Sequence, residues 1–270
     1  MSGRFYPASR AELATAVARL LAAARADLGS TPPAPFRAVI VPHAGYIYSG
    51  PTAAAVFARV TLPGLIVVVA PNHTGVSRAP GGASLWEAGA FRTPLGDVPV
   101  DAACAAQVAA ATSLVAVDHE AHRDEHAIEV VLPFLQVLRS DARIVPLVLA
   151  WDRWEQAREL GDALAGVVRE AGEPVLLLAS SDLNHYESAA VSEKKDARAL
   201  EAVAALDGAE LLSRCRRERI SMCGRGPAAV VLAAARALGA TRGDVVDYRH
   251  SGWASGDDSQ VVGYGGVVIP

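Results

Sequence analysis

The sequence predicts an α/β fold over residues 1–270, with a central, mostly parallel sheet covered by helices on both faces. Short, uniformly apolar runs alternate with segments of helical periodicity along most of the chain. Such runs are typical of strands that are buried on both faces. Hydrophobic residues make up 51% of the chain and charged residues 20%, which favours a packed core over disorder. No long linker, low-complexity tract or helical repeat interrupts the pattern, so we expect a single domain.

Six apolar runs are expected to form the sheet. They are short and rich in β-branched residues, as buried strands are. They occupy residues 36–42, 65–70, 143–149, 175–179, 244–249 and 260–269.

Helices are expected between these strands. Capping signals (Ser9-x-x-Glu12 and Asp152-x-x-Glu155) predict helices over 9–27 and 152–170. Pro51 suits the first turn of a helix that ends near Arg59. The glycine- and proline-rich stretch 74–100 is expected to be a long loop with room for one hairpin. The remaining helices are expected over 102–111, 127–138, 192–205, 208–218 and 227–239.

The composition and charge also indicate where the protein is expected to be located and which partners are not expected. The net charge is −4 and no basic tract is present, so neither nucleic acid nor an acidic membrane is an expected partner. The N-terminus lacks the apolar run of a signal peptide, and no apolar stretch is long enough to span a bilayer, so we expect a cytoplasmic protein. Only Lys194 and Lys195 among the 25 basic residues are lysines, a bias typical of a high-GC bacterial genome.

Histidines follow three of the predicted strands. His43 comes just after the first strand, His73 after the second, and Asp182 and His185 after the fourth. In an open α/β sheet, ligands bind outside the carboxyl ends of the strands. A single histidine at such a place usually only caps a loop, but three strand exits with histidine indicate a functional site.

A glycine-rich turn, Ser221 to Pro227, leads into the last predicted helix and contains Cys223 and Arg225. A cysteine just before a helix N-terminus is expected to have a lowered pKa, which favours the thiolate that binds metal or attacks electrophiles. The other two cysteines, Cys104 and Cys215, are expected to be packing residues. An odd number of cysteines in a reducing compartment argues against a disulfide framework.

The charged run 118–129 contains His122-x-x-Glu125-His126, which matches an inverted zinc-protease motif. That motif needs both histidines on one face of a helix. Here the apolar periodicity begins only after His126, so His122 is expected in a loop and the protease interpretation is disfavoured. His126 remains a candidate to point into the site.

Taken together, the chain resembles the Memo family, whose bacterial members are called AmmeMemoRadiSam system protein B. The matching segments extend over nearly the whole chain, in order: FYPAS (5–9), VPHAGYIYSG (41–50), APNHTG (70–75), DEHAIEVVLPFLQ (124–136), SSDLNHY (180–186), MCGRGP (222–227) and GYGG (263–266).

The resemblance implies the fold of class III extradiol-ring-cleavage dioxygenases, which are non-haem iron enzymes. By motif position it implies that His43, His73 and Cys223 are metal ligands. It places Asp182 and His185 beside the site and makes His126 a lining residue. It also implies a partnership with a radical-SAM enzyme.

The leading hypothesis is a metal-binding, dioxygenase-like redox protein that acts on an unknown small molecule or peptide. Iron or copper is the expected metal and zinc the alternative, because thiolate and imidazole ligands suit all three. His185 is expected to act as acid or base and Asp182 to orient it or accept a proton. Arg225 is expected to bind an anionic group in the substrate pocket, beside His126.

Three rival hypotheses remain open. The pocket can belong to an accessory module that binds a peptide or modified residue without turnover. It can be a zinc hydrolase built on His43, His73 and Asp182. It can also hold a metal-free nucleophile pair of Cys223 and His185.

Overall fold

Four parallel strands form the middle of the sheet in the computed structural model, which describes residues 1–270. They are β1 (Ala38–Val41), β8 (Val175–Ser180), β2 (Leu65–Pro71) and β7 (Arg143–Leu149), in that spatial order. Every side chain of β1, β2 and β8 is buried. Their uniform apolarity is therefore explained by helices on both faces of the sheet, as the sequence predicted.

Antiparallel pairing extends this parallel centre on both sides, so the nine-stranded sheet is mixed. β11 (Val261–Ile269) lies antiparallel to β1 and pairs with β10 (Asp244–His250) and with β9 (His185–Glu187). At the other side, β3 (Ala83–Leu85) lies antiparallel to β7 and parallel to β6 (Val115–Val117). A separate hairpin consists of β4 (Ala90–Thr93) and β5 (Gly96–Pro99).

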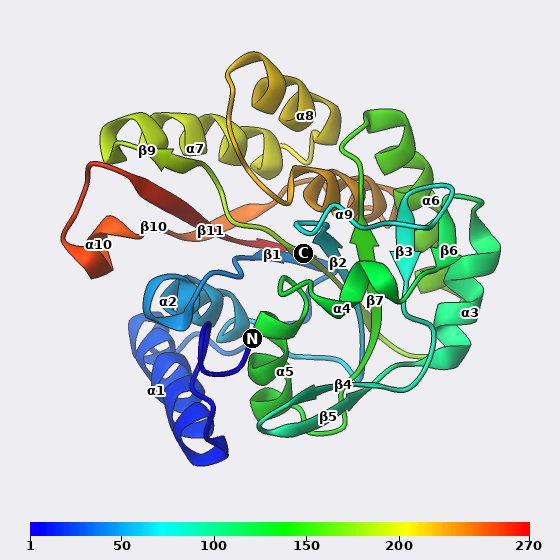
Figure 1. Cartoon of the computed structure of the whole chain (residues 1–270), viewed down its shortest axis with the longest axis horizontal. Coiled ribbons are helices and arrows are strands. Elements are labelled where there is room, and N and C mark those ends of the chain that lie inside the picture. Colours follow the sequence, from blue (N-terminus) through cyan, green and yellow to red (C-terminus); the bar gives the residue numbers. More distant parts are fainter.

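Helices cover both faces of the sheet (Figure 1). On one face, α2 packs against β1, β10 and β11, and α1 packs on α2 and α5. On the other, α9 packs against β8 and β2 and is covered by α6 and α8. The first layer holds α1 (Arg10–Leu28), α2 (Tyr46–Phe57) and α5 (Leu132–Leu138), and the second holds α3 (Ala102–Ala111), α6 (Trp154–Glu170), α7 (Ala189–Ala204), α8 (Gly208–Arg217) and α9 (Arg225–Ala237).

Three single-turn helices lie in connections: α4 (Glu120–Arg123), the 3-10 helix η1 (Glu129–Val131) and α10 (Gly252–Ser255). A cluster of 77 buried hydrophobic residues extends through the sheet and both helix layers. None of the helices combines the length and apolarity that crossing a membrane requires.

Most of the predicted elements are confirmed, but the helix after the first strand begins earlier than expected. The Ser9 hydroxyl caps α1, as predicted. In α2, however, Gly45 is the N-cap and Pro51 lies inside the helix. Proline there leaves the carbonyl of Ile47 without its usual helical partner. The helix nevertheless continues through the proline to Phe57.

The predicted cap of the long helix is also wrong. α6 begins after Arg153, which makes no side-chain cap, and the Asp152 carboxylate instead pairs with Arg225 on α9. The short strands β3, β6 and β9 were not expected, because three residues are too few to establish a period-two pattern.

We predict opposite effects for two glycine-to-alanine changes in α6. A Cβ atom at Gly161 meets Ala233 Cβ at 2.6 Å and the Val230 carbonyl oxygen at 2.8 Å, whereas a Cβ at Gly166 meets nothing within 4 Å. Gly161→Ala should therefore destabilise the protein by about 1–3 kcal/mol through overpacking against α9. Gly166→Ala should stabilise it by up to about 1 kcal/mol, because alanine is the better helix former. Equilibrium unfolding in urea measures both, and equal stability of the two variants would contradict this packing.

Candidate metal centre

The carboxyl ends of the parallel strands bring the candidate site together. His43, His73 and Asp182 each lie two residues beyond the end of their strand, β1, β2 and β8 respectively. Because these strands are parallel neighbours, their exit loops open on the same edge of the sheet. The three residues line one cavity of about 520 Å³.

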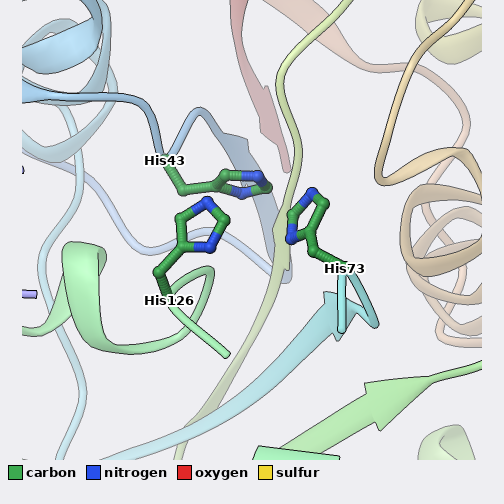
Figure 2. A group of neighbouring side chains, drawn as sticks. All are labelled: His43, His73 and His126. Atoms are coloured by element: carbon green, nitrogen blue, oxygen red, sulfur yellow. The ribbon is translucent and has the colours of Figure 1, made fainter. Parts of the chain in front are cut away.

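His126 completes a group of three histidines whose rings face one another (Figure 2). It comes from the segment between α4 and η1 rather than from a strand end. One ring nitrogen from each of His43, His73 and His126 lies within 4.8 Å of the other two. The ring centroids are 5.2 Å apart for His43 and His73, and 4.6 Å apart for the stacked rings of His73 and His126. Three converging imidazoles form a donor set that can hold a transition metal ion.

A buried carboxylate, Glu125, positions two of these histidines. Its oxygens accept the backbone N–H groups of His73 (2.6 Å), His126 (2.8 Å) and Ala127 (2.9 Å). The Nδ1 atom of His73 donates to Glu125 Oε1 at 2.9 Å, and Nδ1 of His126 lies 3.3 Å from the same oxygen. With Nδ1 of His73 thus carrying the proton, its Nε2 keeps a free lone pair for a metal ion.

His43 is held from the opposite side of the group. The Ser180 hydroxyl donates to the Ala127 carbonyl, so its oxygen accepts the Nδ1 proton of His43 at 2.7 Å. The backbone N–H of His43 donates to the carboxylate of Asp182 at 2.8 Å. These two bonds fix the loop and the ring, and they leave Nε2 of His43 facing the cavity.

Burial keeps two of the three imidazoles neutral at neutral pH, as metal ligation requires. It lowers the pKa of His43 to about 3 and that of His126 to about 4, helped by the neighbouring histidines. Burial also acts to lower the pKa of His73, but the hydrogen bond and charge of Glu125 outweigh it and raise that pKa. The same contacts, with the backbone N–H groups, overcome the burial of Glu125 and lower its pKa to about 2.

Cys223, from the loop between α8 and α9, lies at the edge of this group. Its Sγ atom is 3.4 Å from Nε2 of His43 and accepts the backbone N–H of Asp182 at 3.3 Å. The sequence suggested a lowered thiol pKa, but burial, followed by the charge of Asp182, raises the Cys223 pKa well above its usual range. The thiol is therefore neutral at neutral pH unless a metal ion displaces its proton.

The acid–base candidates His185 and Asp182 line the same cavity, but no hydrogen bond joins them. The Nδ1 atom of His185 donates to the Leu183 carbonyl at 2.7 Å, not to Asp182. The Asp182 carboxylate instead bonds to the backbone of His43, and burial raises its pKa. Asp182 is thus hydrogen-bonded to His43 and not to His185.

Two candidates from the sequence lie outside this cavity. Arg225 pairs with Asp152 and lines a neighbouring cavity. His122 is buried elsewhere, with Nε2 3.0 Å from the Ser84 carbonyl oxygen. His122 was expected in a loop but lies in the single-turn helix α4, which ends at Arg123, so no continuous helix joins the two histidines of the protease motif.

The remaining two cysteines are buried packing residues, as predicted. Burial raises the pKa of Cys104 to about 11 and that of Cys215 to about 12.

Sequence reasoning missed several residues of the site. The burial of Glu125 was not predicted, because this residue lies in a run of charges that is typical of a solvated surface. Phe5 stacks on His126 with ring centroids 4.6 Å apart, and nothing in its local pattern indicates this contact. The other side chains that line the cavity beyond the expected ones are those of Ala44, Tyr186, Ser221, Val262 and Tyr264.

The fold and site together define an α/β protein with a candidate metal centre at the carboxyl ends of its parallel strands. The chain belongs to the Memo-like protein family, whose model matches residues 1–268. It is 38% identical to a MEMO1 family protein of Methanopyrus kandleri, over all of this chain and 97% of the relative. A MEMO1 family protein of Aquifex aeolicus shows the same identity and coverage. One of Aeropyrum pernix is also 38% identical, over 99% of this chain and 97% of the relative.

We predict that His126 makes the metal-free protein sensitive to acid. Its pKa is lowered from 6.5 to about 4 in the folded chain, so the stability due to the neutral ring is complete above about pH 6.5 and is lost as the pH falls toward 4. Between about pH 7 and pH 5, the free energy of unfolding of His126→Asn should therefore fall by about 2 kcal/mol less than that of the wild type. Urea unfolding at both pH values, with a chelator present, measures this difference. Parallel pH profiles of the two proteins would refute the burial of a neutral ring.

Proposed function

We propose that this protein binds a transition metal ion in the histidine cavity and carries out redox chemistry there on a small molecule or peptide. The observation that carries the proposal is the convergence of His43, His73 and His126, with ring nitrogens within 4.8 Å of one another. Hydrogen bonds to Ser180 and Glu125 orient two of these rings before any ion binds, as is usual for metal-ligating histidines.

The donor atoms favour iron or copper, with zinc as the alternative. Imidazole nitrogen suits all three ions, and a neighbouring thiolate shifts preference toward copper(I), zinc or iron. Cys223 Sγ lies close enough to His43 to join the ligand set in place of His126 or beside it. The two possible ligand sets are three histidines, or two histidines and a cysteine. They differ in whether replacing Cys223 removes the metal. When bound, an iron or copper ion would supply one-electron chemistry and open positions for ligands.

The residues around the ion would bind the substrate and move protons. His185 holds its Nδ1 proton against the Leu183 carbonyl, which leaves Nε2 as the nitrogen that exchanges a proton with a substrate. Asp182 lies in the same cavity, and its raised pKa suits a group that accepts and returns a proton. Phe5, Tyr186 and Tyr264 provide aromatic walls against which a ring or an apolar side chain can pack.

The aromatic walls also favour a second candidate, a binding module without turnover. A cavity with aromatic walls beside polar groups holds a peptide side chain or modified residue equally well. The family resemblance also predicts a likeness to class III extradiol dioxygenases and a radical-SAM partner. We retain both as proposals, whichever of the two functions holds.

We predict that the purified protein binds close to one metal ion per chain and that His126→Ala abolishes this binding. Elemental analysis after anaerobic purification, and again after incubation with ferrous, cuprous and zinc ions, measures the content. His119→Ala is the matched control, because His119 lies outside the group and pairs with Glu87. Retention of the metal in Cys223→Ser would support three histidine ligands, and its loss would support the cysteine. A wild type that binds none of the three ions would retire the metal proposal.

We predict that Glu125→Gln lowers metal affinity by about 10–100-fold, because an amide has only one acceptor oxygen for the His73 ring and three backbone N–H groups. Competition with a chromogenic chelator measures the affinity. Glu120→Gln, five residues earlier and paired with Arg123 at the surface, is the control and should keep the wild-type affinity. If both variants bind metal equally well, the carboxylate does not position the ligands.

Turnover separates the two candidate functions. The metal-loaded protein is incubated with catechol and thiol substrates in an oxygen electrode, with His185→Ala as the comparison. Oxygen consumption that depends on His185 supports redox catalysis. Full metal loading without oxygen consumption on either substrate class favours the binding module.

A further inference from the structure

A second cavity, of about 310 Å³, adjoins the histidine cavity between α8 and the start of α9. Three arginines line it: Arg216, Arg219 and Arg225. Ser221 lines both cavities, so the two adjoin at this residue.

The charges in this arginine cavity are unbalanced. Asp152 is the only acidic residue that lines it, and its carboxylate pairs with Arg225. Arg216 and Arg219 have no carboxylate within ion-pair distance, although other arginines nearby, such as Arg214 and Arg217, are fully paired. Arginine is always protonated. Three arginines and one carboxylate therefore give the cavity an excess of two positive charges, carried by the solvent-exposed Arg216 and Arg219.

The backbone at Arg219 shows that an arginine is held here against its conformational preference. Arg219 has φ +53°, in the left-handed region, and follows the C-cap of α8. The Ile220 N–H donates to the Cys215 carbonyl at 2.9 Å, which closes the Schellman motif in which glycine is the usual residue at this position. Lys195 Nζ donates to the Arg219 carbonyl at 2.9 Å and fixes the turn. The fold thus keeps an arginine beside the cavity at a position where glycine would be favoured.

Ser221 links the two cavities through a rigid set of hydrogen bonds. Its hydroxyl donates to Asn184 Oδ1 at 3.0 Å and accepts the backbone N–H of His185 at 2.8 Å. A ligand that lies over Ser221 therefore contacts the arginines on one side and the neighbourhood of His185 on the other.

We propose that the arginine cavity binds the phosphate group of a small phosphate monoester, whose organic part reaches over Ser221 into the histidine cavity. A monoester phosphate is a dianion above neutral pH, which matches the two unbalanced charges. Its three free oxygens accept bonds from the planar forks of two or three guanidinium groups. The phosphate site itself does not depend on the proposed metal chemistry, whereas the position of the organic part deepens that proposal.

Titration of the metal-free protein with inorganic phosphate tests the site, at about pH 8 and low ionic strength, with a chelator present. Calorimetry or phosphorus NMR measures the dissociation constant. Arg219→Gly should weaken binding by at least about tenfold, the usual effect of losing a charge-assisted bond, without loss of stability, because glycine suits the left-handed position. Arg216→Ala should weaken it to a similar degree.

Arg217→Ala is the matched control, because Arg217 lies on the same helix but pairs with Glu210 and Glu218 outside the cavity. It should bind phosphate like the wild type. No measurable binding by the wild type, or equal weakening in Arg217→Ala and Arg219→Gly, would overturn the phosphate site whatever the metal experiments show.

Phenyl phosphate tests the path over Ser221. It should bind more tightly than inorganic phosphate and shift the ring NMR resonances of His185, while inorganic phosphate leaves them in place. Equal affinity for the two ligands, with no shift of His185, would overturn the link between the cavities.

Discussion

The burial of the Glu125 carboxylate is the constraint on which the site depends. A buried charge is costly unless it is paired and hydrogen-bonded. Here the partners are parts of the site itself: the backbone N–H groups of His73, His126 and Ala127 and the ring of His73. The same contacts therefore stabilise the charge and hold the two histidine segments together. The segments are separated by 52 residues in sequence, and no strand pairing joins them directly.

A second set of bonds orients the histidine on the other side of the cavity. Ser180 and Asp182, at the end of β8, hold the ring and the backbone of His43 on the neighbouring strand β1. The stacked rings of Phe5, His126 and His73 fill the space between the two sets. The rings of His43 and His73 are thus each held by a hydrogen bond at Nδ1, and a ligand would meet a largely preformed set of donors.

Features that depend on local interactions could be predicted from the sequence, whereas features that depend on contacts between distant segments could not. Uniformly apolar strands and their exit histidines were predictable, because burial on both faces and the geometry of parallel sheets act locally on the sequence. The inclusion of His126 in the ring cluster was only a possibility, since its position depends on Glu125 meeting a distant loop. Asp152 and Arg225 form an ion pair across 73 residues, so the first was taken for a helix cap and the second for a pocket residue. Pro51 suggested a later helix start, because proline is usual in the first turn, whereas α2 begins at Tyr46 and continues through the proline.

The position of β1 in the sheet has a consequence for how the chain reaches this state. β1 pairs on one side with β8 and on the other with β11, whose residues lie more than 200 positions further along the chain. Until β8 has been synthesised both backbone edges of this apolar strand are unpaired, and one edge stays unpaired until β11 follows. Such edges associate readily with other chains, and pairing over this separation is slow. A ribosome-bound chain would therefore hold His43 on an open strand for most of its synthesis, and the complete donor set would arise only late in folding.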